Sequence, residues 1–179
     1  MPQTDPSTHL HTGYDRLVVM GVSGCGKSTL AQAIAQHLHW TMVEGDTHHT
    51  QDSQAKMAQG IALTDEDRQE WLDTLAHIIE RADAPLVMAC SALKNTYRDT
   101  LRRAAPGQVG FVFMELTQEE SFRRVSQRKG HLFPASLVAS QFATLQTPRG
   151  EPDVLTVDAT AGTEAQLDCV MRWLGRDQD

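Results

Sequence analysis

The sequence predicts an α/β fold in which helices cover both faces of a parallel sheet of about five strands. The first observation is that short, nearly continuously apolar runs alternate with longer helical patterns. Such runs are typical of parallel strands that are buried on both faces. The second observation is the length, because 179 residues, 40% of them hydrophobic, suffice for one buried core. We therefore expect a three-layer sandwich formed by a single domain over residues 15–179, preceded by a flexible leader over residues 1–14.

Five apolar runs fit the strands of this sheet, and they cover residues 16–20, 40–44, 85–90, 109–115 and 154–157. Leu30, Ile34 and Leu38 mark the first helix. Thr64 suits the N-cap of a second helix, whose first turn is acidic and which continues past Trp71. Further helical patterns begin after Ser91 and cover residues 118–128, 134–145 and 164–174. Ligands should gather at the carboxyl ends of the parallel strands.

The charge and the apolar pattern exclude several classes of protein. Sixteen Lys and Arg against 23 Asp and Glu leave a net charge of −7, whereas a nucleic-acid binder carries a basic face. No apolar run approaches the roughly 20 residues of a membrane span. The leader has no apolar signal core, and three scattered cysteines do not suggest a disulfide framework. We expect a cytoplasmic enzyme with no membrane or nucleic-acid partner, although a few focused cations could hold a small anionic substrate.

A glycine-rich segment directly after the first strand predicts a phosphate-binding loop. Residues 21–28 match the pattern G-x-x-x-x-G-K-[ST], for which the alternative is a glycine-rich turn with a surface lysine. In a P-loop, backbone N–H groups and a helix N-terminus face the phosphates, the lysine reaches the terminal phosphates and the hydroxyl ligates Mg²⁺. We therefore expect ATP, with Lys27 as a catalytic residue and Ser28 as a metal ligand. The expected nucleotide-binding residues are Gly21, Ser23, Gly24, Cys25, Gly26, Lys27, Ser28 and Thr29.

Two further expectations concern this loop. Because thiolates are favoured near a helix N-terminus, we expect the Cys25 thiol to be exposed and reactive. The strand over residues 85–90 lacks the terminal acid that supports the metal in many P-loop proteins, and Glu44-Gly45-Asp46 can supply it instead. Asp46 could support Mg²⁺ through water, accept the proton of an attacking hydroxyl, or bind that hydroxyl. The alternative for the triplet is a plain turn.

Segments beyond the loop closely resemble the bacterial gluconate kinases. The most specific are the stretches Cys90-Ser91-Ala92-Leu93-Lys94 with Tyr97-Arg98-Asp99, and Arg128-Lys129-Gly130-His131. The resemblance covers most of the chain, from about Leu17 to Val157. Other matching positions are Glu44-Gly45-Asp46, His49, Lys56-Met57, Gly60, residues 63–68, Trp71-Leu72, Leu101-Arg102, Leu132-Phe133, residues 140–142, Leu145 and Pro148.

This resemblance implies a nucleoside-monophosphate-kinase-like P-loop NTPase fold, ATP and Mg²⁺, and phosphorylation of D-gluconate to 6-phospho-D-gluconate. It also implies a cytoplasmic homodimer. The alternatives are a small P-loop kinase for another sugar or polyol acid such as shikimate, or a catalytically silent nucleotide-binding regulator. The chain departs from the family pattern partly around the acceptor pocket: Glu44 replaces Asp, Thr50 replaces Pro, Thr64 replaces Asn, Glu70 replaces Pro, and Gln146 also differs.

A sugar acid needs cations for its carboxylate and hydrogen-bonding groups for its hydroxyls. Lys94 and Arg98 stand at i and i+4, so a helix would place them near one face. We expect Arg98 to bind the acceptor carboxylate, and the alternative for each such residue is a solvated or structural charge. The candidate substrate-binding residues are Asp46, His49, Lys56, Arg68, Lys94 and Arg98.

Phosphoryl transfer also requires that charge be neutralised and water excluded. The basic segment 123–133 contains Gly130 as a candidate hinge and predicts a lid. Arg124 and Arg128 match the family pattern and lie one helical turn apart, so we expect both to contact phosphate as catalytic residues. The alternative is a solvated basic helix face. The topology alone places Asp158 and the residue that follows it near the adenine.

Overall fold

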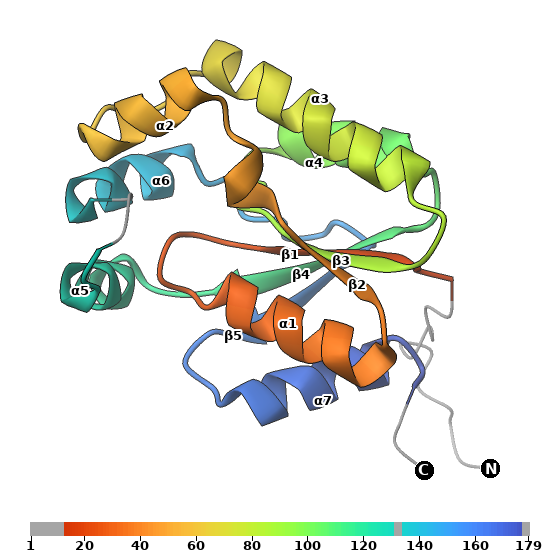
Figure 1. Cartoon of the computed structure of the whole chain (residues 1–179). Helices are drawn as coiled ribbons and strands as arrows, with labels where there is room; N and C mark the ends of the chain where they lie inside the picture. The colour runs from red at the N-terminus through yellow and green to blue at the C-terminus, as the bar shows by residue number, and fades with distance from the viewer. Residues whose placement is uncertain (1–12, 131–133, 177–179) are drawn as a thin grey trace.

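The computed structural model describes residues 13–130 and 134–176 and contains a five-stranded, fully parallel sheet (Figure 1). The strand order is β2-β3-β1-β4-β5, with β1 in the centre. In the register of the sheet, Val18 of β1 lies between Met88 of β3 and Phe111 of β4. The predicted fold class is confirmed. The strands are β1 (Arg16–Met20), β2 (Thr41–Glu44), β3 (Leu86–Ala89), β4 (Val109–Glu115) and β5 (Val154–Asp158).

Helices cover both faces of the sheet, with α1 and α7 on one face and α3 and α4 on the other (Figure 1). Leu17 and Val19 of β1 belong to the core beneath α1 and α7, whereas Val18 and Met20 belong to the core beneath α3 and α4. Because successive side chains of a strand point to opposite faces, a strand covered on both faces is apolar throughout. These helices are α1 (Lys27–Leu38), α3 (Asp65–Arg81), α4 (Asn95–Ala104) and α7 (Thr163–Trp173).

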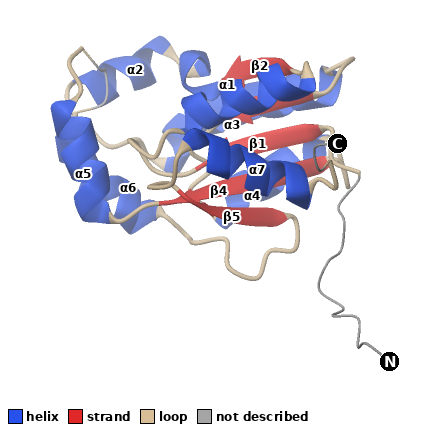
Figure 2. Cartoon of the chain, turned by 90° about the horizontal axis from the view of Figure 1, so that it is seen from below, coloured by secondary structure: helices blue, strands red, loops and turns tan. Residues whose placement is uncertain are grey.

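Three shorter helices gather at one end of the sheet, where the strands deliver their carboxyl ends (Figures 1 and 2). The helix expected over residues 134–145 is divided, because the chain first forms a 3₁₀ turn over Ala135–Leu137. No helix in the described part of the chain is long and apolar enough to cross a membrane. The short helices are α2 (Gln51–Ala58), α5 (Gln118–Gln127) and α6 (Val138–Thr144).

The start of α3 confirms the predicted cap. Thr64 Oγ1 accepts a hydrogen bond of 3.1 Å from the Asp67 backbone N–H, and Asp67 Oδ2 accepts one of 3.0 Å from the Thr64 N–H. This reciprocal capping box satisfies backbone donors that a helix N-terminus leaves unpaired. Hydrogen bonds from Lys56 and then from Thr64 lower the pKa of the Asp67 carboxyl to about 2.

Gly110 of β4 provides a test of packing beneath the C-terminal helix. A Cβ at this position would lie 2.8 Å from Tyr14 Cδ2 and 2.9 Å from Trp173 Cη2. We expect Gly110→Ala to lower the free energy of unfolding by about 1–3 kcal/mol, because overpacking forces neighbouring groups to shift. Denaturant titration measures the change. Gly13→Ala is the control, since no atom of the described residues lies within 4 Å of a Cβ there. Equal losses in both variants would contradict the packing argument.

Candidate active site

The loop between β1 and α1 depends on glycines in the left-handed region. The backbone φ is +146° at Gly21, +81° at Gly24 and +93° at Gly26, values that side-chain-bearing residues rarely adopt. A Cβ at Gly21 would also lie 2.9 Å from both Cys25 Sγ and the Met114 carbonyl oxygen. Since Gly26 is the N-cap of α1, the loop and the positive end of the α1 dipole face the same space.

Lys27 and Ser28 begin α1 and carry the polar groups of the loop. Lys27 Nζ donates a hydrogen bond of 3.1 Å to the Val22 carbonyl oxygen, and no ion pair involves Lys27 among the described residues. Ser28 Oγ donates a hydrogen bond of 2.5 Å to Glu44 Oε2. The Lys27 ammonium group therefore remains available to bind an anion, and the hydroxyl proton of Ser28 points to the Glu44 carboxylate.

The end of β2 brings two carboxylates to this loop. Gly45 separates Glu44 from Asp46, and a Cβ at Gly45 would collide with the Ala89 carbonyl oxygen at the end of β3. The Gly45 carbonyl accepts a hydrogen bond of 2.8 Å from Trp71 Nε1, which fixes the turn from below α3. Neither β3 nor the residue after it supplies an acid, and burial raises the pKa of the Cys90 thiol to about 12.

A cleft of about 870 Å³ opens between the loop, β2 and the short helices. It brings together most of the residues that the sequence analysis selected. Six others, Gly21, Cys25, Lys56, Lys94, Arg98 and Arg124, do not line it. Those that line it are Ser23, Gly24, Gly26, Lys27, Ser28, Thr29, Asp46, His49, Arg68 and Arg128.

His49 lies in the cleft as a desolvated imidazole. Its ring stacks on Trp71 with ring centroids 4.2 Å apart and an interplanar angle of 14°. Burial, opposed by the Asp46 charge and reinforced by the Arg68 charge, lowers the pKa of His49 below its usual value. His49 Nδ1 is buried and has no hydrogen-bond partner within the described ranges. A neutral ring with an unsatisfied nitrogen suits a ligand that carries hydroxyl groups.

Arg68 and Lys94 flank Tyr97 but differ in their ion pairing. Lys94 Nζ donates hydrogen bonds of 2.8 and 2.9 Å to the two oxygens of Asp65, so its charge is already compensated. Arg68 Nη1 donates one of 3.2 Å to the Tyr97 hydroxyl, which in turn donates to Asp65. The partner of Arg68 is thus a neutral phenol, and Arg68 alone of the two lines the cleft.

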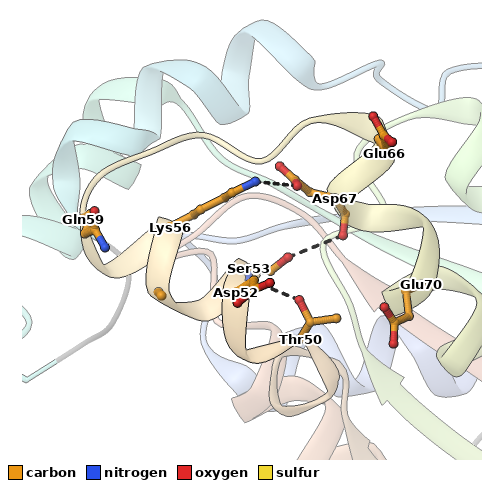
Figure 3. Close-up of a pocket in the computed structure, with 9 residues that line it drawn as sticks. Thr50, Asp52, Ser53, Lys56, Gln59, Glu66, Asp67 and Glu70 are labelled. Atoms are coloured by element: carbon orange, nitrogen blue, oxygen red, sulfur yellow. Dashed lines mark hydrogen bonds and ion pairs between the residues drawn. The ribbon is translucent and has the colours of Figure 1, made fainter.

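Lys56 lies outside the cleft. Its Nζ forms an ion pair of 2.7 Å with Asp67 Oδ1, inside a separate pocket of about 460 Å³ between α2 and α3 (Figure 3). The lining of this pocket also includes the acidic side chains of Asp52, Glu66 and Glu70. The structure therefore gives no support to Lys56 as a contact of a ligand in the cleft.

Arg98 cannot reach the cleft in this structure, in contrast to the expectation that it binds the acceptor. Its side chain is 0% exposed, and each guanidinium nitrogen donates within the fold. Nη2 lies 2.7 Å from Glu151 Oε1, and Nη1 lies 2.8 Å from the Ala92 carbonyl oxygen. The remaining hydrogen bonds connect Nε to Glu151, and Nη2 to Asn95 Oδ1 and the Gln146 carbonyl oxygen. Arg98 therefore joins α4 to the loop before β5.

The two arginines of the expected lid occupy different places. Arg128 ends α5 and lines the cleft. Arg124 Nη1 instead donates hydrogen bonds of 3.2 Å to the Gly24 carbonyl and 3.3 Å to the Ala159 carbonyl, so it joins α5 to the phosphate loop and to the chain after β5. The Asp158 carboxylate accepts from the Thr160 N–H and hydroxyl. Residues 131–133 of the expected lid lie outside the described residues.

The Cys25 side chain contradicts the expectation of an exposed thiol. The residue is only 1% exposed, and it packs where Gly21 has no Cβ. Its backbone N–H donates a hydrogen bond of 3.3 Å to the Val22 carbonyl. The thiol therefore belongs to the core under the loop and is not a reactive surface group.

The cleft also contains residues that were not selected as site residues from the sequence, among them Glu44, Ser91 and Gln141. Gln141 Oε1 accepts a hydrogen bond of 2.7 Å from the Ser23 backbone N–H, which ties α6 to the phosphate loop. The signals available were the acidic triplet for Glu44 and the matching family segments for Ser91 and Gln141.

Comparisons with known proteins agree on one family. The family model of an AAA domain matches residues 17–152. The thermoresistant gluconokinase of Escherichia coli K12 is 41% identical over 145 residues, which cover 79% of this chain and 82% of the relative. The gluconokinase of Gluconobacter oxydans 621H is 39% identical over 160 residues, which cover 87% and 89%.

Solved structures that resemble this chain include a gluconokinase and other small kinases. The crystal structure of a gluconokinase from Sinorhizobium meliloti 1021 superposes with a TM-score of 0.83 at 39% identity, over 93% of both chains. A shikimate kinase from Aquifex aeolicus, with a TM-score of 0.61 at 13% identity over 89% of this chain and 96% of its own, shares the fold alone.

The lowered pKa of His49 makes stability depend on pH. Below the unfolded pKa of about 6.5, the unfolded chain binds a proton that folded His49 excludes, so the free energy of unfolding decreases as the pH falls. We expect His49→Gln to reduce this loss between pH 7.5 and pH 5, as measured by urea titration at each pH. The exposed His77→Gln is the control, and identical pH profiles for wild type and His49→Gln would refute the assignment.

Proposed function

The chain belongs to the gluconokinase family of P-loop kinases, and from this premise we propose that it transfers the terminal phosphoryl group of ATP to the 6-hydroxyl of D-gluconate. The observation that carries the proposal is that one cleft contains both the phosphate loop with Lys27 and the acceptor-side groups Asp46, His49 and Arg68. A phosphoryl donor and a hydroxyl acceptor that share a cleft can be held in line for transfer.

The phosphate end of the cleft suits a nucleoside triphosphate. Backbone N–H groups of the glycine loop and the N-terminus of α1 favour anionic oxygens. Lys27 adds a positive charge that no carboxylate among the described residues compensates. In the proposed mechanism, this ammonium group stabilises the negative charge that develops on the transferring phosphoryl group.

The donor set beside Lys27 fits Mg²⁺. A hydroxyl at Ser28 and carboxylates at Glu44 and Asp46 are hard oxygen groups, and Mg²⁺ in phosphoryl-transfer sites takes one or two carboxylates together with waters and phosphates. The hydrogen bond from Ser28 Oγ to Glu44 orients the hydroxyl so that its lone pairs remain available. When bound, the ion neutralises charge on the phosphates. Glu44 then acts as a positioning residue for Ser28.

The acceptor side divides the recognition of gluconate among three residues. Asp46 accepts the proton of the attacking 6-hydroxyl, or binds that hydroxyl. His49, kept neutral by burial, meets another hydroxyl through its unsatisfied nitrogen. Arg68, oriented by Tyr97, binds the carboxylate. Lys94 and Lys56 already pair with carboxylates, and Arg98 is buried. We therefore leave these three cations out of the proposed acceptor site.

The remaining parts of the proposal concern the lid, the assembly and the location. Arg128 contributes charge from the cleft side of the segment 123–133, whereas Arg124 acts through the Gly24 carbonyl. A lid at this place excludes water during transfer.

We also propose a cytoplasmic homodimer, as the family resemblance implies, and light scattering after size-exclusion chromatography tests the dimer. The shikimate alternative is not favoured, because the likeness to shikimate kinase is one of fold alone. The regulator alternative is not favoured, because the relatives of this chain are gluconokinases.

A coupled assay of ADP formation tests the function directly. We expect turnover with gluconate and none above background with shikimate, glucose or no acceptor. Lys27→Ala should remain folded and lose turnover by orders of magnitude, because its charge acts on the transferring phosphoryl group. Asp46→Asn should lower kcat by a much larger factor than it lowers the affinity for ATP. Wild-type turnover confined to another acceptor would refute the gluconate assignment.

Recognition of the carboxylate by Arg68 is tested with glucitol, which carries the hydroxyls without the acid. A charge-assisted hydrogen bond contributes about 1.5–3 kcal/mol, so Arg68→Ala should lower kcat/KM for gluconate roughly ten- to a hundredfold. The KM for ATP should hardly change, and discrimination against glucitol should decrease. Lys56→Ala is the matched control. Equal losses for gluconate and glucitol would assign Arg68 another role.

A further inference from the structure

The turn between β3 and α4 holds a strained residue at the wall of the cleft. Ala92 has a φ of +44°, a left-handed conformation in which the Cβ of an L residue is crowded. Its side chain is 0% exposed. Ser91 and Leu93, on either side of it, both line the cleft. Strain of this kind persists only where the surroundings hold the backbone, and it clusters at functional sites.

The three carbonyl groups of residues 91–93 in this turn each accept a hydrogen bond from a different part of the fold. The Ser91 carbonyl accepts from the Gly21 N–H at 3.3 Å, the Ala92 carbonyl from Arg98 Nη1 at 2.8 Å, and the Leu93 carbonyl from the Gln146 N–H at 2.8 Å. The first of these bonds ties the turn to the start of the phosphate loop. The strained conformation is therefore fixed between the loop and α4.

Arg98 supplies the one bond of the three that comes from a side chain. Its guanidinium is itself oriented by Glu151 and by Asn95. Because the Arg98 side chain is fully buried and held by these bonds, it has little freedom to follow a turn that relaxes. Its hydrogen bond to the Ala92 carbonyl thus stabilises the left-handed conformation of Ala92. A change of Ala92 to a right-handed conformation would move the neighbouring Ser91.

Ser91 carries a hydroxyl that the fold leaves unused. The residue is half-buried in the cleft, and its hydroxyl has no hydrogen-bond partner in the described part of the chain. A Cβ at Gly45 would lie 3.4 Å from the Cβ of Cys90, so the end of β3 adjoins the turn that carries Asp46. A hydroxyl both donates and accepts, which suits a polyol.

We propose that Ser91 binds a hydroxyl of the acceptor and that Arg98 is a positioning residue that acts through the strained Ala92 turn. The inference rests on the proposed function, since it deepens the acceptor site of the same reaction. Arg98 thereby influences the acceptor without contact, through the backbone that places Ser91.

Ser91→Ala tests the contact. Loss of one hydrogen bond should raise the KM for gluconate about three- to tenfold and leave the KM for ATP unchanged. Thr96→Ala removes an exposed hydroxyl of α4 and should behave as wild type. An unchanged KM for gluconate in Ser91→Ala would overturn the inference, whereas a wild-type enzyme without gluconate turnover would instead refute the proposed function.

The positioning role is tested by a rescue. Arg98→Met should lower the Tm and raise the KM for gluconate, because the turn is released. Adding Ala92→Gly should return the KM toward the wild-type value, since glycine adopts positive φ without strain. The Tm should stay low, because the second change does not replace the bonds to Glu151. A KM that stays raised in the double variant, or that recovers only together with the Tm, would overturn the positioning role.

A second pair of variants, Glu151→Gln with and without Ala92→Gly, provides the same test if Arg98→Met does not fold. Glu151→Gln retains an acceptor for Arg98 but removes the charge that orients it. We expect a smaller rise in the KM for gluconate, about two- to threefold, and Ala92→Gly should reverse it. No rise in Glu151→Gln, together with a wild-type KM in Ser91→Ala, would overturn both parts of the proposal.

Discussion

The position of β1 between β3 and β4 determines where the functional side chains lie. All five strands are parallel and both faces are covered by helices, so the carboxyl edge is the place where polar groups can meet a ligand. The chain leaves β1 directly into the phosphate loop. The close approach of Gly45 to the Ala89 carbonyl then brings Glu44 and Asp46 to the same edge. A larger residue at Gly45 would collide with this carbonyl, displace the turn that carries both carboxylates, and disturb the hydrogen bond from Ser28 to Glu44.

Ion pairing within the fold decides which cations remain for substrate. Lys56 is compensated by Asp67, Lys94 by Asp65, and Arg98 by Glu151. Separating a buried pair leaves an unpaired charge in the interior, which costs about 3–5 kcal/mol, so a ligand carboxylate competes poorly for Arg98. The hydrogen-bond partner of the Arg68 side chain among the described residues is a neutral phenol. Of these four cations, Arg68 is therefore the one without an ion pair among the described residues, which supports its proposed role in binding the acceptor.

What the sequence predicted depends on local patterns, and what it missed depends on distant partners. The β1 run, the glycine loop and the Thr64 cap are each encoded within a few residues, and the structure contains all three. The i and i+4 spacing of Lys94 and Arg98 gave no information about which face of α4 is buried. Arg98 faces inward because its anion stands 53 positions later in the chain. Burial of Cys25 likewise depends on the space left by a glycine four residues earlier.

The departures from the family pattern are mostly changes of helix caps. Thr50 is the N-cap of α2 and accepts a hydrogen bond of 3.1 Å from the Ser53 N–H, and Thr64 caps α3. Gln146 Oε1 accepts one of 2.8 Å from the Asn95 N–H at the start of α4. Several polar residues satisfy a helix N-terminus comparably well, so such positions vary without altering a binding site. These cap changes therefore stabilise helices, whereas the proposed acceptor residues Asp46, His49 and Arg68 lie in segments that match the family.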